Sequence, residues 1–490
     1  MQLRSDIIQF DLRGMLAILD NVHSDLFFAR TKKYNRVYRK NEYFNGGFYL
    51  PLSQGRIGVG LGAITLLQKK MPHLKFRVRH LISSSPISQV AIPEFSSMPY
   101  RWYQREALER IAVNRMGSIE IPTGGGKSLI ILGAAAGLAN QRNVLIIVPT
   151  LANKSELQVL AKDLSLELKE YSELRNEWSG ESGIMYISTA RSVCNDLESS
   201  NNLAVLNSVG SLIADEGHHL SADSWNQVMT SLPNLSRVYG FSGTVVNGRR
   251  DFTSFDQIPL EDALIYSATG GILYSVSTSQ IPEFIDRPVL IEVPYEWPKS
   301  YSDLENTNSW QKYSKALASN SHRIQFLAQI IQHMDDLGRT SITPVERKET
   351  GKELLKATGL NNVVCWYGNE EIFDVRERPL AYEEAMKRVQ EGQIQHIIAT
   401  SHFNESVNLP NISTCILASG KKSRVANQRS GRIARIGPLK SAVINVRDDI
   451  GILSGHSESR SRSMKKYFKV HSQQVSSIEE IGPALQFKFS

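Results

Sequence analysis

One glycine-rich segment has the residue types of a phosphate-binding loop: Pro122-Thr123-Gly124-Gly125-Gly126-Lys127-Ser128. It follows an apolar run and precedes a helical stretch from Leu129 to Ala139. Glycines let backbone N–H groups surround phosphate oxygens, and the N-terminus of the following helix adds positive potential. In such a loop Lys127 contacts the β- and γ-phosphates, and the Ser128 hydroxyl binds Mg²⁺. Ile121 replaces the first glycine of the G-x-x-x-x-G-K-[ST] pattern, so an ordinary glycine-rich turn stays an alternative.

An acidic pair, Asp215 and Glu216, comes directly after the apolar run Leu212 to Ala214. A carboxylate at the end of a strand can bind Mg²⁺, and its neighbour can orient and deprotonate a water that attacks phosphate. Adjacent acids are common on surfaces, but they are much less common at the end of a buried strand. We therefore predict Asp215 as a metal ligand and Glu216 as a catalytic base.

The order of these and further motifs resembles that of superfamily 2 helicases and translocases of the DExH type. The resemblance covers roughly Tyr100 to Val446, and these blocks carry it: Arg101-Trp102-Tyr103-Gln104, Val148-Pro149-Thr150, Ser188-Thr189-Ala190, Asp215-Glu216-Gly217-His218, Ser242-Gly243-Thr244, Ala399-Thr400-Ser401 to Pro410, and Gln428-Arg429-Ser430-Gly431-Arg432-Ile433-Ala434-Arg435.

The resemblance implies a role for each block. Arg101 and Gln104 would bind the adenine of ATP, and the phosphate-binding loop would hold its phosphates with Mg²⁺. Thr150 and Thr189 would contact a nucleic-acid backbone. Hydrolysis would be coupled to strand movement by His218, Ser242, Gly243 and Thr244.

The last block implies that a second domain completes the ATP site. Gln428 would position the attacking water, and Arg432 and Arg435 would stabilise charge on the transferred phosphoryl group. For either arginine alone, a surface salt bridge is the alternative.

Two motifs depart from the family pattern. The segment Asn404-Glu405-Ser406-Val407-Asn408-Leu409-Pro410 has serine and asparagine where the family has glycine and aspartate, which puts the usual ribose contact in doubt. Gly217 stands where alanine or cysteine is commoner, a change that we do not expect to affect the chemistry.

The charge of the chain is concentrated near its N-terminus. The whole chain carries +7, whereas the fourteen Lys and Arg and six Asp and Glu of residues 1–98 give that segment +8. In the run Leu74 to Arg79, a strand would bury Leu74, Phe76 and Val78 and present Lys75, Arg77 and Arg79 on the other face. We predict that these three cations contact nucleic-acid phosphates, and a solvated face is the alternative.

Other features of residues 1–98 are similar to the small domain that precedes the helicase domains of UvsW-type phage helicases. They include Asn45-Gly46-Gly47, a hairpin-like stretch from Leu50 to Gly58, and a helical Leu61 to Lys70. The later motifs also look closer to the UvsW, RecG and XPB-like branch than to DEAD-box RNA helicases.

Apolar runs alternate with helical stretches along the rest of the chain, as a parallel sheet requires. With the resemblance, this predicts an α/β protein with two tandem RecA-like parallel-sheet domains after a small basic α/β domain. Serine and glycine between Asp262 and Pro282 indicate a hinge. The predicted domains are residues 1–95, 99–282, 283–450 and a C-terminal extension, 451–490, with a helix and a closing strand. The apolar runs are Gly117–Ile121, Asn143–Val148, Val209–Ala214, Val238–Phe241, a run from Val289, Asn362–Trp366, His396–Thr400, Thr414–Ala418 and Ala442–Val446.

Composition excludes several classes of protein. With 41% hydrophobic and 21% charged residues the chain is globular in balance, and its three cysteines show no metal-ligand spacing. The N-terminal fifteen residues lack an uninterrupted apolar stretch, and no run approaches the ~20 apolar residues of a membrane span. We expect a cytoplasmic protein with no membrane partner, in the host cytoplasm if a phage encodes it.

These inferences predict an ATP-dependent DNA helicase or translocase that moves on DNA without reading its sequence. Its expected substrates are single-stranded, forked or branched DNA, in recombination, repair or replication restart. Three alternatives stay open: an RNA helicase, a motor subunit of a restriction system, and an ATP-gated clamp that binds junctions without unwinding them.

Overall fold

A computed structural model describes most of the chain. It divides into two compact units, residues 1–121 with 126–276 and residues 277–490 with 122–125. The predicted domain boundaries stay predictions. The described residues are 7–13, 15–20, 25–35, 40–47, 49–83, 89–171, 180, 182–199, 203–246, 250–307, 309–367, 371–400, 412–418 and 439–486.

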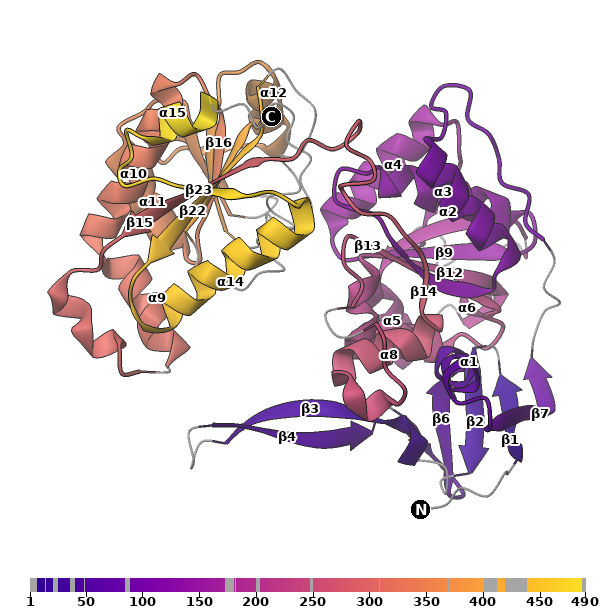
Figure 1. Ribbon diagram of the computed structural model, residues 1–490. Helices are drawn as coiled ribbons and strands as arrows, with labels where there is room; N and C mark the ends of the chain where they lie inside the picture. The colour runs from indigo at the N-terminus through magenta and orange to yellow at the C-terminus, as the bar shows by residue number, and fades with distance from the viewer. Residues whose placement is uncertain are drawn as a thin grey trace. The chain divides into compact units, whose positions relative to one another are not determined.

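The first unit contains a seven-stranded sheet with the order β10-β11-β9-β12-β13-β8-β14, and every pairing in it is parallel. Figure 1 shows α2, α3 and α4 on one side of this sheet and α5, α6 and α8 on the other. The strands are β8 Met116–Glu120, β9 Asn143–Val148, β10 Leu168–Glu170, β11 Met185–Thr189, β12 Val209–Asp215, β13 Arg237–Ser242 and β14 Ile272–Ser275. The helices are α2 Trp102–Val113, α3 Lys127–Ala139, α4 Leu151–Asp163, α5 Ala190–Glu198, α6 Leu203–Ser208, α7 Asp223–Ser231 and α8 Leu260–Thr269, with short 3₁₀ turns η3 Gly217–Ser221 and η4 Phe255–Gln257.

The N-terminal part of the same unit forms a five-stranded sheet, β5-β6-β2-β1-β7, and a separate two-stranded ribbon, β3-β4. Helix α1 follows β6, as the sequence predicts. The bounds are β1 Ile7–Arg13, β2 Leu16–Asp20, β3 Phe28–Asn35, β4 Lys40–Gly47, β5 Leu50–Leu52, β6 Arg56–Gly60, α1 Leu61–Lys70 and β7 Lys75–Ser83.

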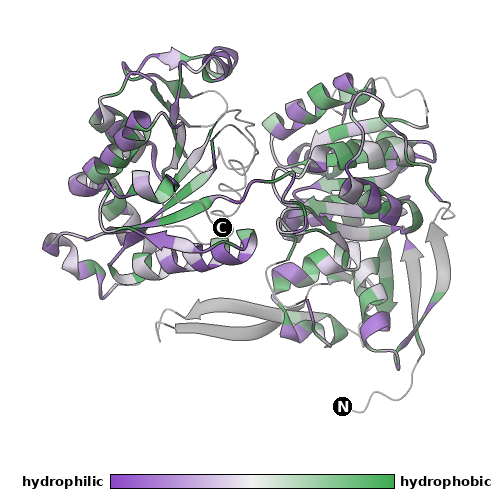
Figure 2. Ribbon diagram, turned by 45° about the horizontal axis from the view of Figure 1, so that its top comes forward, coloured by the Kyte–Doolittle hydropathy of each residue, from purple (hydrophilic) through white to green (hydrophobic). Residues whose placement is uncertain are grey.

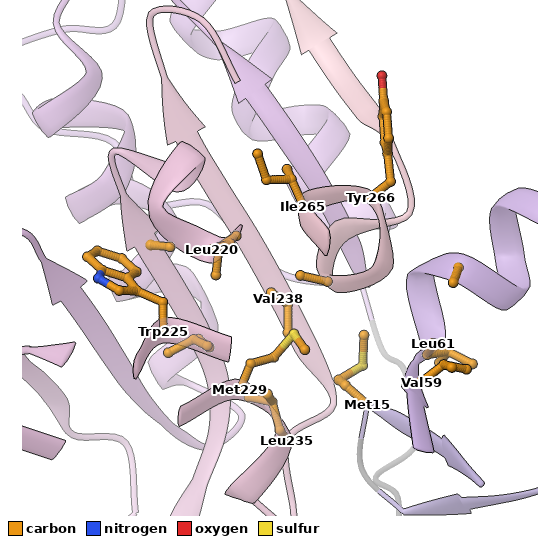
Figure 3. Packing of buried hydrophobic residues seen from close by; sticks show 14 of the residues in the cluster. Met15, Val59, Leu61, Leu220, Trp225, Met229, Leu235, Val238, Ile265 and Tyr266 are labelled. Carbon is orange, nitrogen blue, oxygen red and sulfur yellow. The ribbon is translucent and has the colours of Figure 1, made fainter. Parts of the chain in front are cut away.

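This N-terminal sheet shares one hydrophobic core with the seven-stranded sheet. Figure 3 shows Met15, Val59 and Leu61 in the same cluster as Val238 of β13 and Ile265 of α8. Burial of side chains from both sheets in one cluster removes apolar surface from water that neither sheet could cover alone. The N-terminal sheet is therefore packed against the seven-stranded sheet as part of one folded body.

Two glycines allow α1 to approach the C-terminal end of α8 closely. The Gly60 N–H donates to Ser267 Oγ at 3.0 Å. A Cβ on Gly60 would lie 2.1 Å from the Ser267 carbonyl oxygen, and a Cβ on Gly62 would lie 2.3 Å from the Gly270 nitrogen and 2.4 Å from the Tyr266 carbonyl oxygen. No side chain fits at either position, because the neighbouring atoms belong to backbone.

We expect Gly62→Ala to destabilise the first unit. Alanine has a helix propensity about 1 kcal/mol better than that of glycine, but overpacking against fixed backbone costs about 1–3 kcal/mol. The clash therefore outweighs the propensity, and the free energy of unfolding should fall. Thermal unfolding should show a lower melting temperature. Gln68→Ala, on the exposed face of α1, is the matched control and should stay within about 0.5 kcal/mol of wild type. A Gly62→Ala variant as stable as wild type would contradict the close approach.

The second unit contains a nine-stranded sheet, β19-β18-β17-β20-β16-β21-β22-β15-β23. Its pairings are parallel except those of the short β18 with β17 and β19. The strands are β15 Val289–Tyr295, β16 Ser341–Pro344, β17 Val363–Trp366, β18 Ile372–Phe373, β19 Pro379–Leu380, β20 His396–Ala399, β21 Thr414–Leu417, β22 Ala442–Asp448 and β23 Ser472–Gln474. The helices are η5 Lys299–Leu304, α9 Trp310–Ser319, α10 Ser321–Asp336, α11 Lys348–Thr358, α12 Tyr382–Gln390, α14 Gly451–Phe468 and α15 Ile481–Gln486.

Parallel sheets with helices on their faces confirm the predicted fold class. The central strands β9, β12 and β13 are buried along their whole length and mainly apolar, because helices cover both faces. Figure 2 shows this as green colour along the central strands of both sheets. The helix and closing strand predicted for the C-terminal extension are α14 and β23.

A buried carboxylate attaches α14 to its sheet. The Glu292 side chain on β15 is 2% exposed and accepts hydrogen bonds from Ser461 Oγ, at 2.5 Å, and from the Arg447 guanidinium. Burial by itself raises the pKa of Glu292, but bonds from Ser461, Ser472, Arg447 and Lys465 outweigh it and lower the pKa to about 2. The carboxylate is therefore ionised at neutral pH and holds α14 and β23 to β15.

The hinge predicted between Asp262 and Pro282 is wrong over much of its length. Helix α8 and strand β14 occupy residues 260–275, and the division between the units falls after Val276. Ser267, one of the serines that suggested a hinge, makes a buried contact with Gly60 instead, and its neighbour Thr269 is buried as well. Thr269 Oγ1 lies 2.8 Å from Ser118 Oγ and donates to the Ile265 carbonyl oxygen at 2.9 Å. Small polar residues serve close packing here, and sequence alone does not distinguish that use from a linker.

Candidate functional site

Five predicted motifs lie at one edge of the seven-stranded sheet. The phosphate-binding loop follows β8, and the motifs that begin near Thr150, Thr189, Asp215 and Ser242 stand at the carboxyl ends of β9, β11, β12 and β13. These strands are all parallel, so their carboxyl ends meet at the same edge. The order of strands in the sheet thus brings together residues that are more than 100 positions apart in the sequence.

The phosphate-binding loop has the backbone shape that a bound phosphate chain requires. Gly124 and Gly126 have φ values of 86° and 74°, a region that favours glycine. The loop closes through a hydrogen bond from the Gly125 N–H to the Pro122 carbonyl oxygen at 2.9 Å, and α3 begins at Lys127. The N-terminus of a thirteen-residue helix without a side-chain cap suits a polyanion, so the residues present fit ATP.

The structure places Gln104 beside this loop. Gln104 lies in the first turn of α2, is 2% exposed, and donates from Nε2 to the Gly126 carbonyl oxygen at 3.2 Å. Its Oε1 accepts the Arg101 N–H at 2.9 Å, which forms a capping box. A Cβ on Gly126 would lie 2.5 Å from Gln104 Nε2, so glycine is required there for this contact. The adenine-binding role of Arg101 and Gln104 stays a prediction.

The acidic pair lies near the lysine of the loop, with Asp215 buried and Glu216 half-buried. The Glu216 N–H donates to Asp215 Oδ1 at 2.9 Å, and Glu216 has a left-handed φ of 52°. Burial, and then the Glu216 carboxylate, raise the pKa of Asp215 to about 7. Burial also acts to raise the pKa of Glu216, but a hydrogen bond from His218 and the charge of Lys127 outweigh it and lower that pKa. Glu216 is therefore the member of the pair that carries a full charge at neutral pH.

The backbone strain at Glu216 is consistent with a functional position, because a non-glycine residue with positive φ persists only where its surroundings hold it. Asp215 and Ser128 could contribute a carboxylate and a hydroxyl to Mg²⁺, together with phosphate oxygens of ATP. Among the residues that the structure describes, no group of three or more His, Cys, Asp or Glu side chains could hold a metal ion.

The residues predicted to couple hydrolysis to movement contact the predicted base. Ser242 Oγ lies 3.1 Å from Glu216 Oε2 and 3.0 Å from His218 Nδ1, and His218 Nδ1 lies 3.2 Å from the same Glu216 oxygen. The Thr244 N–H donates to Ser242 Oγ at 3.3 Å. A change at the Glu216 carboxylate would therefore alter the contacts of Ser242 directly.

The structure gives a physical reason for Gly217 in the acidic motif. A Cβ on Gly217 would lie 2.6 Å from the Gly240 Cα of β13. Two glycines thus allow η3 and β13 to approach backbone to backbone, and alanine or cysteine would not fit. The departure from the commoner family residue follows from this contact, which sequence reasoning missed.

Thr150 and Thr189 are helix caps in this structure. Thr150 Oγ1 accepts the Asn153 N–H at 3.2 Å at the start of α4, and Thr189 Oγ1 accepts the Ser192 N–H at 3.3 Å at the start of α5. Helix α4 follows β9 and helix α5 follows β11, and these two adjacent strands end at the edge that carries the other motifs. Their hydroxyls satisfy orphan N–H groups of these helices, and contact with a nucleic-acid backbone stays a prediction.

The basic strand is confirmed in part. Leu74 and Phe76 are buried, and Lys75 and Arg77 are exposed on β7, at the edge of its sheet. The prediction that Val78 is buried is wrong, because its side chain is 48% exposed. The register of β7 with β1 shifts directly after Val78, and a shift of this kind breaks the alternation of faces. The side chain of Arg79 lies outside what the structure describes.

Several predicted residues of the second unit fall outside the described ranges. They are Gln428, Arg432, Arg435 and the segment from Asn404 to Pro410. The described part of the preceding motif, Ala399 and Thr400, lies at the carboxyl end of β20. Roles for these residues stay predictions from the sequence.

Ser341, His396 and Asp335 of the second unit form a hydrogen-bonded set that has no predicted role. His396 Nδ1 lies 2.8 Å from Ser341 Oγ, and its Nε2 lies 3.0 Å from Asp335 Oδ1. Ser341 and His396 are fully buried, and burial lowers the pKa of His396. A serine that no substrate can reach is not a nucleophile, so this set ties β16 and β20 to α10.

No helix in the described part of the chain is long and apolar enough to cross a membrane.

Comparison with known proteins gives matches to two helicase-type families. Residues 97–247 match the family described as "Type III restriction enzyme, res subunit", and residues 370–437 match "Helicase conserved C-terminal domain".

Two curated relatives carry helicase names. "Putative helicase 22" of a Sulfolobus islandicus filamentous virus is 26% identical over 347 residues, which cover 66% of this chain and 58% of that protein. "ATP-dependent DNA helicase uvsW" of Enterobacteria phage T4 is 22% identical over 350 residues, which cover 68% of this chain and 65% of that protein. The chain thus spans less than two thirds of the length of either relative.

A solved structure, "S. cerevisiae Dbp5 bound to RNA and ADP BeF3", shares the fold, with a TM-score of 0.53 and 14% identity over 79% of this chain and 92% of that one. Both parts of a helicase are thus matched in the same chain and in the expected order. Together with the motifs at the edge of the first sheet, these matches show that the chain is similar to superfamily 2 helicases, with a UvsW protein among its relatives, and they support an ATP-dependent helicase enzyme.

Proposed function

We propose that the protein is a DNA helicase or translocase that hydrolyses ATP, with Mg²⁺, to move on DNA and remodel forked or branched DNA in recombination, repair or replication restart. One observation carries the proposal: Glu216 contacts both His218 and Ser242 at the edge of the sheet that also holds Lys127. DNA rather than RNA is supported by the name of the phage T4 relative, and the exposed cations of β7 support nucleic-acid binding.

The site residues divide the chemistry between them. Bound ATP with Mg²⁺ would supply the phosphoanhydride bond that is cleaved. Lys127 would neutralise charge on the terminal phosphates, and Glu216, ionised at neutral pH, would accept a proton from the attacking water at its carboxylate. Protonation of Glu216 weakens its attraction for Ser242 and His218, which gives the residues after β13 a signal that hydrolysis has occurred.

The second domain would complete the site with the arginines of its last motif. Gln428 would orient the water, and Arg432 and Arg435 would stabilise the charge that develops in the transition state. This assignment rests on the resemblance of residues 428–435 to the family motif.

A substrate panel tests the proposal. The ATPase rate should rise with single-stranded DNA more than with RNA of the same sequence, and labelled forks or four-way junctions should be unwound when ATP is present. Stronger stimulation by RNA would favour an RNA helicase. Stable junction binding without unwinding would favour an ATP-gated clamp, and DNA cleavage with an added nuclease subunit would favour a restriction motor.

We expect the β7 cations to contribute to DNA binding through phosphates. Replacing Lys75, Arg77 and Arg79 with Ser should weaken fork binding and flatten its dependence on log salt by up to about 0.9 per lost duplex contact, or about 0.7 on single strands. Unwinding should fall more than ATPase activity. The measurement is a titration of fork DNA at several salt concentrations.

A charge-matched control for this triple variant comes from three exposed lysines of the second unit that form surface ion pairs, Lys348, Lys356 and Lys387. Their replacement with Ser removes the same charge from another surface. Equal slopes for wild type and the β7 variant would mean that β7 is only a solvated face, and the assignment of the ATP site would be unaffected.

A further inference from the structure

Glu120 is an acidic residue in a strand that otherwise has no charge. It is the last residue of β8, and its side chain is 4% exposed. In the sheet it pairs with Ser242 of β13 on one side and with Ser275 of β14 on the other. It therefore stands between the coupling motif and the strand that ends the first unit, one residue before the segment that leads into the phosphate-binding loop.

The Glu120 carboxylate makes contacts with three segments. Oε1 accepts the Val245 N–H at 3.1 Å, directly after the coupling motif. Oε2 accepts the Ser275 hydroxyl at 3.1 Å and pairs with the Arg250 guanidinium. Backbone bonds follow the same path, since the Ile121 N–H donates to the Ser242 carbonyl oxygen at 3.1 Å and the Val276 N–H donates to the Glu120 carbonyl oxygen at 3.0 Å.

Strand packing does not require an acid at this position. A buried carboxylate is costly unless cationic and N–H partners compensate for its lost water, so this one depends on Arg250 and Val245. In return it ties Val245, Arg250 and Ser275 to the end of β8. The residues after Ser242 are thereby held to the same strand end as the phosphate-binding loop and to the exit of the first unit.

We propose that Glu120, paired with Arg250, is a positioning residue for energy coupling. It holds Val245, Arg250 and the end of β14 together, so that a displacement of Ser242 is passed to the connection that leaves the first unit. This inference rests on the proposed helicase function. Glu120 acts through Val245 and Ser242 and does not take part in the chemistry.

The test compares Glu120→Gln, Arg250→Gln, the double variant and wild type. Glutamine keeps the size of the side chain and an oxygen for the Val245 N–H, which favours folding. The number of base pairs unwound per ATP should fall about tenfold in each single variant, with the KM for ATP within about twofold of wild type. The double variant should be no worse than the worse single variant, because both substitutions break one unit.

Two further measurements separate positioning from a general loss of structure. Lys356→Gln removes one side of the exposed Lys356–Glu377 pair and should change neither the number of base pairs unwound per ATP nor the KM for ATP. Amide hydrogen exchange of residues 242–246 and 250–252, measured without DNA, should be about tenfold faster in Glu120→Gln and Arg250→Gln, while the global melting temperature stays close to wild type.

The outcomes distinguish the inference from the function on which it rests. If wild type unwinds no DNA, the proposed function fails, and the exchange experiment still decides whether Glu120 holds the segment. Unchanged exchange would overturn the inference. So would a parallel fall of ATPase and unwinding with a lower melting temperature, since that pattern shows a structural role only.

Discussion

Replacing Glu216 with Gln, or Lys127 with Ala, is expected to abolish DNA-stimulated ATP hydrolysis. Glutamine cannot accept a proton from water, and loss of a general base lowers a rate typically by about 10²–10⁴. Alanine at position 127 removes the cation that we predict to face the phosphates, and the charge of this lysine also acts to lower the pKa values of Asp215 and Glu216. We expect Glu216→Gln to lose turnover only and Lys127→Ala to lose both turnover and nucleotide affinity.

A coupled ATPase assay with saturating single-stranded DNA measures turnover, and fluorescent nucleotide titration measures binding. Glu216→Gln should bind ATP at least as well as wild type. Glu377→Gln, a surface acid of the second unit, is the matched control and should behave as wild type. Near-native turnover by either Glu216→Gln or Lys127→Ala would rule out the proposed hydrolytic site.

The second large effect is expected at Arg435. If this residue acts as an arginine finger, Arg435→Ala should lower turnover by about 10³–10⁵ while nucleotide binding changes little, because the guanidinium acts on charge that appears in the transition state. Arg435→Lys should restore only a small part of the activity, since an ammonium lacks the planar fork of donors.

Single-turnover hydrolysis with excess enzyme separates this effect from product release. Arg378→Ala, which removes an arginine that is 64% exposed in the second unit, is the control and should retain full activity. Weakened nucleotide binding with unchanged turnover would show that the motif at residues 428–435 has been misassigned.

The sequence by itself determined the secondary structure around the ATP site. The run Asn143 to Val148 is β9 residue for residue, and Val144 to Val148 are all apolar because both faces of the strand are covered. The positions of the motifs were informative for the same reason: the loop that contains Lys127 and the acidic pair that contains Glu216 each follow such a run. Parallel strands end at one edge, so these local signals were enough to predict that the two side chains share a site.

Local sequence was not enough where the outcome depended on a neighbour distant in the chain. Val78 has the alternation of a buried residue, yet a register shift against β1 exposes it. Gly217 looked like a tolerated variant, yet it is required by the backbone of Gly240. Ser267 looked like part of a linker, yet it accepts the Gly60 N–H in a buried contact.

Glu120 shows the same limit most clearly. An acid in an apolar strand was visible in the sequence, but its meaning depends on Val245, Arg250 and Ser275, which come from three later segments. Hydrophobic periodicity reports which face of an element is buried and does not report what lies against it. Tertiary structure alone decided these contacts, because the cost of burying a charge or a Cβ is set by the atoms that fill the space around it.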